Sequence, residues 1–301
     1  MSVCVNDSYL ELKMEAALPD SNNTLEFVRS SPRLVAGIAA WVAGWLVFEG
    51  LWYCVKRRPY SWAEARWSMM AFVVISGSAT LVTAALQPLL WRVWPYRLWT
   101  LPMDSFWPWA MAWFVTDFAY YCIHRMLHAT RIGWSVHAPH HSARQLSLLD
   151  SLRSSWGEQP MGVIVFGVPL VLLGVPPAIA GFFYVFVALY QFIVHTEVSW
   201  SLGPLSGLIY TPAAHRVHHS TVRAESDSNY GGFFVVFDRI FGTWVPATRT
   251  FRPAAYGLPA RQPECLRDMI IAEVARVAGG IRRAQGLANK LHYAFTRPAD
   301  D

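Results

Sequence analysis

The stretch from His124 to His219 decides the fold, because it holds three histidine motifs: His124-Arg-Met-Leu-His128, His137-Ala-Pro-His140-His141 and His215-Arg-Val-His218-His219. His195 lies between the second and third motifs, so nine of the chain's ten histidines fall in this stretch. In an α-helix, which turns about 100° per residue, positions i, i+3 and i+4 share one face. We therefore expect each motif to direct its imidazoles at one point.

The number of these histidines predicts two metal ions. Neutral imidazole is a common ligand of iron, zinc, copper and nickel. A buried ring without a partner would cost about 1–3 kcal/mol, whereas metal coordination satisfies it. One tetrahedral or octahedral ion cannot use so many ligands. A solvated histidine-rich tract is the simpler alternative, but it predicts a continuous run rather than motifs separated by apolar sequence. The predicted ligands are His124, His128, His137, His140, His141, His195, His215, His218 and His219.

The composition is typical of a membrane protein. Of the 301 residues, 54% are hydrophobic and 15% are charged, against about 25% charged in soluble domains. The net charge of +5 suits contact with an anionic lipid surface, so we expect no nucleic-acid partner. The four cysteines form no C-x-x-C pair, which predicts no disulfide framework and a reducing compartment.

Apolar segments predict the topology. Leu34–Val55, Met69–Trp91 and Phe106–Ile123 each have the length of one membrane span. The basic run at 56–58 follows the first span and indicates that its end is cytoplasmic. The uncharged segment from Pro160 to Val194 would form a helix of about 52 Å, too long for a hydrocarbon core of about 30 Å. Gly174-Val-Pro176-Pro177 should therefore divide it into two short helices that return to the same side.

This topology brings all three histidine motifs and His195 to the cytoplasmic side. The predicted fold is an all-α, multi-pass integral membrane bundle of about four to five spans with a cytoplasmic histidine-rich helical cap. The predicted divisions are an N-terminal tail (1–33), N-terminal membrane spans (34–106), a catalytic region (107–250) and a C-terminal amphipathic segment (251–301). The last should contain two helices, 264–278 and 281–295, separated by Gly279-Gly280.

Three carboxylates are candidate outer partners of the ligand histidines. Asp117 precedes His124 by seven residues, nearly two helical turns, and so shares the face of His124 and His128. An acidic side chain within a span is a functional candidate, and we expect it to accept the outer N–H of a ligand histidine. Helix packing is the alternative role. Asp150 and Glu197 are further candidates, with ordinary surface carboxylates as the alternative.

The motifs resemble those of the fatty acid hydroxylase (sterol desaturase) superfamily. The resemblance covers about residues 117–244. It begins with Asp117-Phe-Ala-Tyr-Tyr-Cys-Ile-His124 and continues with His195-Thr196-Glu197, Thr211-Pro212, Asn229-Tyr230-Gly231 and Asp238-Arg239-Ile-Phe-Gly242-Thr243. The three residues between His124 and His128, rather than four, favour the hydroxylase side over the acyl-CoA desaturases. The C-terminal part is most similar to the alkylglycerol monooxygenase branch. It also makes Asn229 a candidate outer partner.

This resemblance implies an integral membrane enzyme with a histidine-bound di-iron centre. Two ferrous ions (zinc is possible after purification) would use O2 as co-substrate to remove hydrogen from an alkyl C–H bond of a lipid or sterol-like substrate. Hydroxylation or desaturation would follow. Acid–base groups alone cannot break such a bond. No G-x-G-x-x-G fingerprint is present, so electrons must come from a separate protein or a soluble reductant. Tyr121, Trp134 and Trp156 are candidates to line the lipid path, with interfacial anchoring as the alternative.

Two other functions use the same histidines. A zinc-dependent membrane lipid hydrolase would activate water, but the chain lacks the H-E-x-x-H motif that supplies a glutamate base. A metal transporter would place its ligands near the bilayer midplane, whereas these histidines follow the ends of predicted spans. We therefore expect a lipid oxygenase.

Overall fold

The computed structural model describes residues 32–153, 155, 157–258 and 262–298, with the side chains at 77–80, 82–84, 87, 159–160 and 223–224 left out. The chain divides into two compact units, 1–44 and 45–301. Every part of the candidate site lies in the second unit. Trp156, a candidate to line the lipid path, lies outside the described residues.

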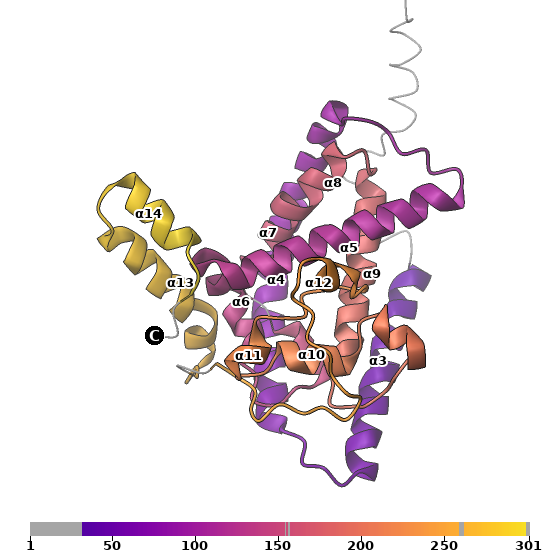
Figure 1. Cartoon of the computed structure of the whole chain (residues 1–301), viewed down its shortest axis with the longest axis vertical. Helices are drawn as coiled ribbons and strands as arrows, with labels where there is room; N and C mark the ends of the chain where they lie inside the picture. The colour runs from indigo at the N-terminus through magenta and orange to yellow at the C-terminus, as the bar shows by residue number, and fades with distance from the viewer. Residues whose placement is uncertain (1–31, 154, 156, 259–261, 299–301) are drawn as a thin grey trace, which may run out of the picture. The chain divides into compact units, whose positions relative to one another are not determined.

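Among the described residues, seven helices of ten residues or more form the framework (Figure 1). They are α3 (Pro32–Val55), α4 (Trp62–Val93), α5 (Phe106–Ala129), α6 (Arg131–His141), α9 (Pro177–Val194), α13 (Leu266–Arg283) and α14 (Gly286–Phe295). Short helical turns join them: η1 (Trp94–Tyr96), η2 (Leu148–Leu152), α7 (Glu158–Met161), the π-helical η3 (Gly162–Gly167), α8 (Val168–Leu172), η4 (Gly203–Gly207), α10 (Pro212–His218), α11 (Arg223–Ser226) and α12 (Val236–Ile240).

The all-α prediction is confirmed for the described residues. Their only β pairings are two isolated bridges, Ile209 with Phe234 and Ser220 with Tyr256. Two helices of this part, α3 and α9, are long and apolar enough to cross a membrane. They indicate a membrane protein, while the full count of four to five spans stays a prediction.

The predicted break in the segment 160–194 is confirmed. Helix α8 ends at Leu172, Gly174 adopts a left-handed φ of +85°, and α9 begins at Pro177. A Cβ at Gly174 would collide with the backbone of Trp99, so both the φ angle and the close approach require glycine. The chain therefore reverses here, and α9 ends at Val194, directly before His195.

Two predicted boundaries are wrong. Helix α5 does not end at Ile123 but continues to Ala129, so His124 and His128 lie on the helix itself. Helix α13 passes through Gly279-Gly280 and ends at Arg283. A helix interior tolerates glycine at about 1 kcal/mol, and a Cβ at Gly280 would collide with the ring of Tyr293. Gly280 therefore lets α14 pack closely on α13, and neither glycine separates the two helices.

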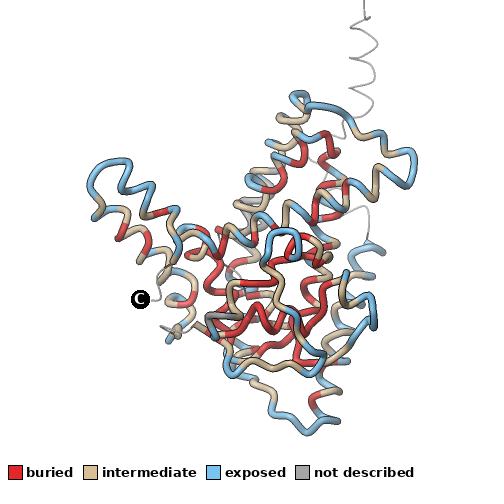
Figure 2. Tube along the Cα trace, viewed as in Figure 1, coloured by how far each residue is buried: buried red, intermediate tan, exposed pale blue. Residues whose placement is uncertain are grey.

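Aromatic packing joins α5 to α9. Trp113 lies parallel to Phe183 with ring centroids 6.4 Å apart, and it contacts Phe233 of the chain beyond α10 at 4.8 Å. Buried side chains concentrate where α5, α6, the end of α9 and α10 meet (Figure 2). The apolar core thus fixes four helices around one place, which is where the histidines lie.

Candidate metal centre

The histidines form two buried groups. The first group comprises His124, His128, His137, His141 and His218, and the second comprises His140, His195, His215 and His219. Within each group the candidate ligand atoms all lie within 4.8 Å of one another. The groups adjoin, because the rings of His141 and His219 stack with centroids 4.2 Å apart. All nine histidines that the motifs singled out are therefore brought together.

The grouping corrects one expectation, since neither H-x-x-H-H motif points at a single place. His137 and His141 of α6 belong to the first group, whereas His140 belongs to the second. The motif on α10 divides the other way, with His218 in the first group and His215 and His219 in the second. Residues i and i+4 differ by about 40° around a helix, whereas i+3 is displaced by about 60° to the other side. The outer pair of each motif thus faces one group, and the middle histidine faces the other.

Local sequence signals hold the two motif helices in register. Thr130 caps α6 by accepting the Gly133 N–H at 3.0 Å, and Pro139 is tolerated near its end. Thr211 caps α10 and Pro212 occupies its first position, where a missing N–H costs nothing. His219 is the C-terminal cap residue of α10. These caps start both helices at defined residues and so define the direction of each imidazole.

Backbone carbonyls fix the tautomer of four histidines. The Nδ1 atoms of His124, His140 and His218 lie 3.0, 3.1 and 2.8 Å from the carbonyl oxygens of Tyr230, Arg153 and Ser228. His195 makes the same contact with the Gln191 carbonyl. A carbonyl only accepts, so each Nδ1 must carry the proton. The Nε2 of each ring is then left with a lone pair.

Carboxylates face two further histidines, both in the first group. Glu158 Oε1 lies 3.0 Å from Nδ1 of His137, and Asp227 Oδ1 lies 3.7 Å from Nδ1 of His128. A carboxylate behind a ligand histidine orients the ring and increases its basicity. The first group thus has stronger outer partners than the second, in which the described partners are carbonyls.

The inward nitrogens fit bound cations. Within the described part of the chain, the buried Nε2 atoms of all five histidines of the first group have no hydrogen-bond partner. In the second group, Nε2 of His195 lies 2.9 Å from Nε2 of His140 and 2.7 Å from that of His215. His140 and His195 both carry their protons on Nδ1, so their lone pairs face each other and repel. A cation among them would remove this repulsion.

Burial keeps these rings neutral, as metal ligation requires. It lowers the pKa of His140 to about 4 and that of His218 to about 3. Burial likewise holds the pKa values of a further set well below the usual range, namely His124, His128, His141, His195, His215 and His219. At neutral pH the lone pairs are therefore free of competing protons.

Asp117 does not contact a histidine, which corrects the expected partnership. Its two carboxylate oxygens accept the backbone N–H groups of Phe233 and Phe234 at 2.7 and 2.9 Å. Seven residues correspond to about 10.5 Å along a helix, so Asp117 lies too far from His124 to reach it. It acts on the site indirectly, because it anchors the segment that carries Tyr230 and its carbonyl.

The other three candidate outer partners also stabilise surrounding loops. Asp150 accepts from Ser68 Oγ and from the Ser147 backbone, at 2.6 and 2.8 Å. Glu197 binds Arg252 and the Tyr256 hydroxyl. The Asn229 side chain accepts from Val245 N at 2.8 Å and donates to the Ala214 carbonyl at 3.1 Å. None of these contacts is with a histidine.

Sequence reasoning missed several of the groups around the histidines. The carbonyl partners carry no residue-type signal, since every residue has one. Glu158 is an isolated carboxylate directly before the long uncharged segment 160–194, and this position was the available signal for a functional role. Arg216, between His215 and His218, is fully buried and donates to four backbone carbonyls, those of Phe251, Arg249, Thr196 and Val198. It thereby joins two chain segments, 196–198 and 249–251, to the helix of the third motif.

Aromatic residues surround both the site and an adjacent groove. Trp134 packs against His128 and His141, with centroids 5.2 and 5.4 Å away, and the Tyr121 hydroxyl pairs with Thr243. An apolar groove of about 480 Å³ lies between α5 and α9. It is lined by Phe106, Trp109, Ala110, Trp113, Phe114, Phe182, Phe183 and Phe234. Phe234 also bonds to Asp117 through its N–H, so the groove adjoins the chain segment that supports the histidines.

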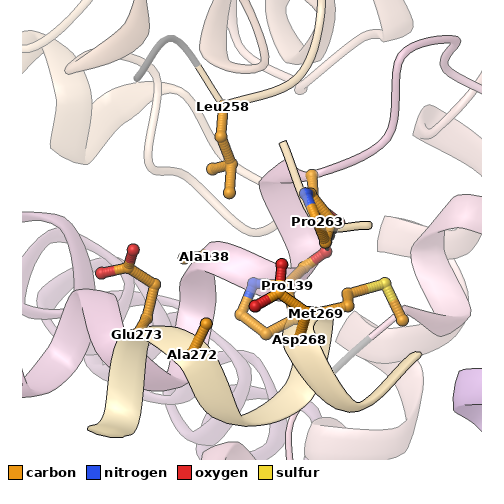
Figure 3. Close-up of a pocket in the computed structure, with 9 residues that line it drawn as sticks. Ala138, Pro139, Leu258, Pro263, Asp268, Met269, Ala272 and Glu273 are labelled. Carbon is orange, nitrogen blue, oxygen red and sulfur yellow. Dashed lines mark hydrogen bonds between the residues drawn. The ribbon is translucent and has the colours of Figure 1, made fainter. Parts of the chain in front are cut away.

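A second, much smaller pocket lies between α6 and α13 (Figure 3). Its volume is about 20 Å³, which leaves room for a water molecule and excludes a lipid. Ala138 and Pro139, between the histidines of the second motif, line one wall, and Met269 and Glu273 line another. It marks the place where the C-terminal helices support α6.

The two buried histidine groups fit a metal site, and the apolar helices of the described residues indicate a membrane protein. In comparisons with known proteins, residues 109–243 match the fatty acid hydroxylase family. This match covers the region of the motifs and confirms the predicted superfamily. No solved structure gives a significant match to this chain.

The similar proteins also confirm the predicted branch. Alkylglycerol monooxygenase of Homo sapiens is 43% identical over 149 residues, 50% of this chain and 33% of the relative. The alkylglycerol monooxygenase of Caenorhabditis elegans is 31% identical over 245 residues, 78% of this chain and 46% of the relative. Ornithine lipid hydroxylase OlsE of Rhizobium tropici is 33% identical over 149 residues, 47% of this chain and 45% of the relative. The chain thus spans a third to just under half of these relatives.

Proposed function

We propose that this protein is an O2-dependent membrane oxygenase that hydroxylates an alkyl C–H bond of a lipid. The observation that carries the proposal is the convergence of nine buried histidines. The inward Nε2 atoms of the first group have no hydrogen-bond partner, and those of the second group contact one another. The relatives are lipid monooxygenases and hydroxylases by name, which supports the oxygenase over the zinc hydrolase. Desaturation of the same bond is the alternative outcome.

The two histidine groups would hold two iron ions, five ligands on one side and four on the other. Bound iron would supply the oxidant that an unactivated C–H bond needs. The protein's part is to hold the imidazoles in one tautomer, through the carbonyls of Tyr230, Arg153, Ser228 and Gln191. It also excludes water, because every one of these rings is buried. Because the imidazoles are held in fixed orientations and shielded from water, the site is already in its binding geometry before the substrate arrives.

The groove between α5 and α9 would bind the alkyl chain of the substrate. Trp109, Trp113 and Phe183 present apolar ring faces along it, with no charged side chain among the lining residues. Alkyl chains bind such surfaces by the removal of apolar area from water, at about 25 cal/mol per Å². Trp113 and His124 lie eleven residues apart on α5, about 16 Å along the helix. A lipid in the groove would therefore reach the histidines with one end.

We further infer a multi-pass topology with the site on the cytoplasmic side, following the basic run at 56–58. Reducing equivalents would come from a separate electron-transfer protein or a soluble reductant. The lipid bilayer and its lipids are the expected partners.

Turnover under labelled oxygen tests the function. Protein purified without oxygen and loaded with ferrous iron is mixed with lipid extract, a chemical reductant and ¹⁸O2, and the lipids are analysed by mass spectrometry. Hydroxylation predicts a lipid product that gains one ¹⁸O atom. A product lacking two hydrogens identifies desaturation. Ester or amide cleavage with ¹⁸O from labelled water, in zinc-loaded protein, would contradict the oxygenase.

A further inference from the structure

The C-terminal helices α13 and α14 form a hairpin that is fastened to the helix of the second histidine motif. The Arg131 N–H donates to the Thr296 carbonyl at 2.9 Å, and the Arg131 guanidinium lies 4.6 Å from the Tyr293 ring centroid. Arg297 forms an ion pair with Asp227. Since Arg131 is the first residue of α6, the hairpin is held firmly at its inner side.

The outer side of α14 carries an apolar ridge. Leu287, Leu291 and Phe295 are 72%, 49% and 58% exposed, whereas Ala294 on the inner side is buried. These three residues follow one another at i, i+4 and i+8 and thus form one continuous line along the helix. Exposed large apolar side chains in such a line mark a surface with a partner rather than scattered surface residues.

The charge around this ridge has one sign. Residues 281–298 contain four basic side chains, Arg282, Arg283, Lys290 and Arg297, and no acidic one. Arg297 is engaged with Asp227, which leaves three exposed basic side chains: Arg282 and Arg283 at the end of α13 and Lys290 on α14. Leucine and phenylalanine on one face with lysine and arginine at its edges are typical of helices that lie in the interface of an anionic bilayer.

We propose that α14 lies on the surface of the bilayer, with Leu287, Leu291 and Phe295 inserted among the lipid headgroups and Arg282, Arg283 and Lys290 bound to anionic lipids. The charges are complementary to such a surface, and the apolar helices α3 and α9 keep the chain beside a membrane. This inference does not depend on the reaction at the histidines.

Site-directed fluorescence in nanodiscs tests the proposal. A bimane label is placed at Leu291→Cys in the full-length protein, with Cys4, Cys54, Cys122 and Cys265 replaced by serine. Lipids carrying a quenching nitroxide near the headgroup are added to nanodiscs with or without phosphatidylglycerol. The matched control is Asn289→Cys, two residues away on α14 and about 200° around the helix. Unchanged metal content of both variants reports an intact fold.

We expect strong quenching at position 291 in anionic nanodiscs, weak quenching at 289, and less quenching at 291 in neutral nanodiscs. Replacing Arg282, Arg283 or Lys290 by glutamine should lower the preference for anionic lipid about fivefold per side chain. Equal quenching at 291 and 289 would overturn the proposal. The proposal would also be overturned if position 291 became shielded from solvent only with a second copy of the chain or an added acidic protein, and not with anionic lipid.

Discussion

The Glu158 carboxylate offers a sharp test of the proposed metal centre. It lies 3.0 Å from Nδ1 of His137, and its side chain is 26% exposed. Glu158→Gln keeps an oxygen that can accept the Nδ1 proton but removes the negative charge. Glu158→Ala removes both. Loss of such an outer partner lowers metal affinity by about 10–100-fold.

The exposure of Glu158 places the glutamine variant at the lower end of this range, because solvent already screens the lost charge. We expect about a tenfold loss of affinity for glutamine, or about 1.4 kcal/mol, and about a hundredfold loss for alanine. Only the ion held by the five-histidine group should be affected. His140, His195, His215 and His219 should retain the other.

The assay is an anaerobic titration of iron-loaded protein with a competing chelator. The variants should release one ion at lower chelator concentration than the wild type and the second ion at the same concentration. Glu273→Gln is the matched control, since this side chain is 23% exposed and pairs with Arg276 on α13 rather than with a histidine. The reasoning would be refuted if Glu158→Ala released both ions at the same chelator concentrations as the wild type, or if its affinity for both ions fell equally.

Three further predictions follow from the same geometry. His140→Ala should abolish turnover and lower metal content while membrane insertion stays intact, as measured by metal analysis and membrane fractionation. Normal activity would show that the second motif is not part of the site. Acidification of the metal-free protein from pH 7 to pH 5 should lower its free energy of unfolding. Folding lowers the pKa of His140 to about 4 and that of His218 to about 3, whereas a histidine in the unfolded chain has a pKa of about 6.5. Between these values only the unfolded chain binds the protons, so acid favours unfolding. The loss should be about 2 kcal/mol at pH 5 for each such histidine, measured by denaturant titration, and a flat profile would show that these rings are not buried. Ala110→Trp should fill the groove and reduce turnover of long-chain lipid with metal content unchanged; unaltered turnover would place the substrate elsewhere.

The sequence was most informative where chemistry depends on residue type and spacing. The helical spacing of the three histidine motifs predicted that their side chains converge. The pair Pro176-Pro177 after Gly174 predicted the reversal before α9. Both features follow from local rules of helix geometry and of proline. The family followed from the same motifs and is confirmed over residues 109–243.

The sequence was least informative where tertiary packing decides. The i+3 histidine of each H-x-x-H-H motif faces away from its outer pair, but a single helix does not show that rings of α6 and α10 come together into two shared groups. Asp117 shares a face with His124 but meets the N–H groups of Phe233 and Phe234, more than a hundred residues away in sequence. Gly280 lies within a helix because the Tyr293 ring needs its space. Every residue has a backbone carbonyl, so the sequence does not show that the carbonyl of Tyr230 accepts from a histidine.

The most direct test of the central claim is the metal content and coordination of protein purified without oxygen. Chemical analysis and X-ray absorption should give two iron ions per chain, with imidazole nitrogens at about 2.1 Å. His137→Ala should weaken one ion and His215→Ala the other. A single ion per chain, or two ions released together by either substitution, would contradict the two separate histidine groups.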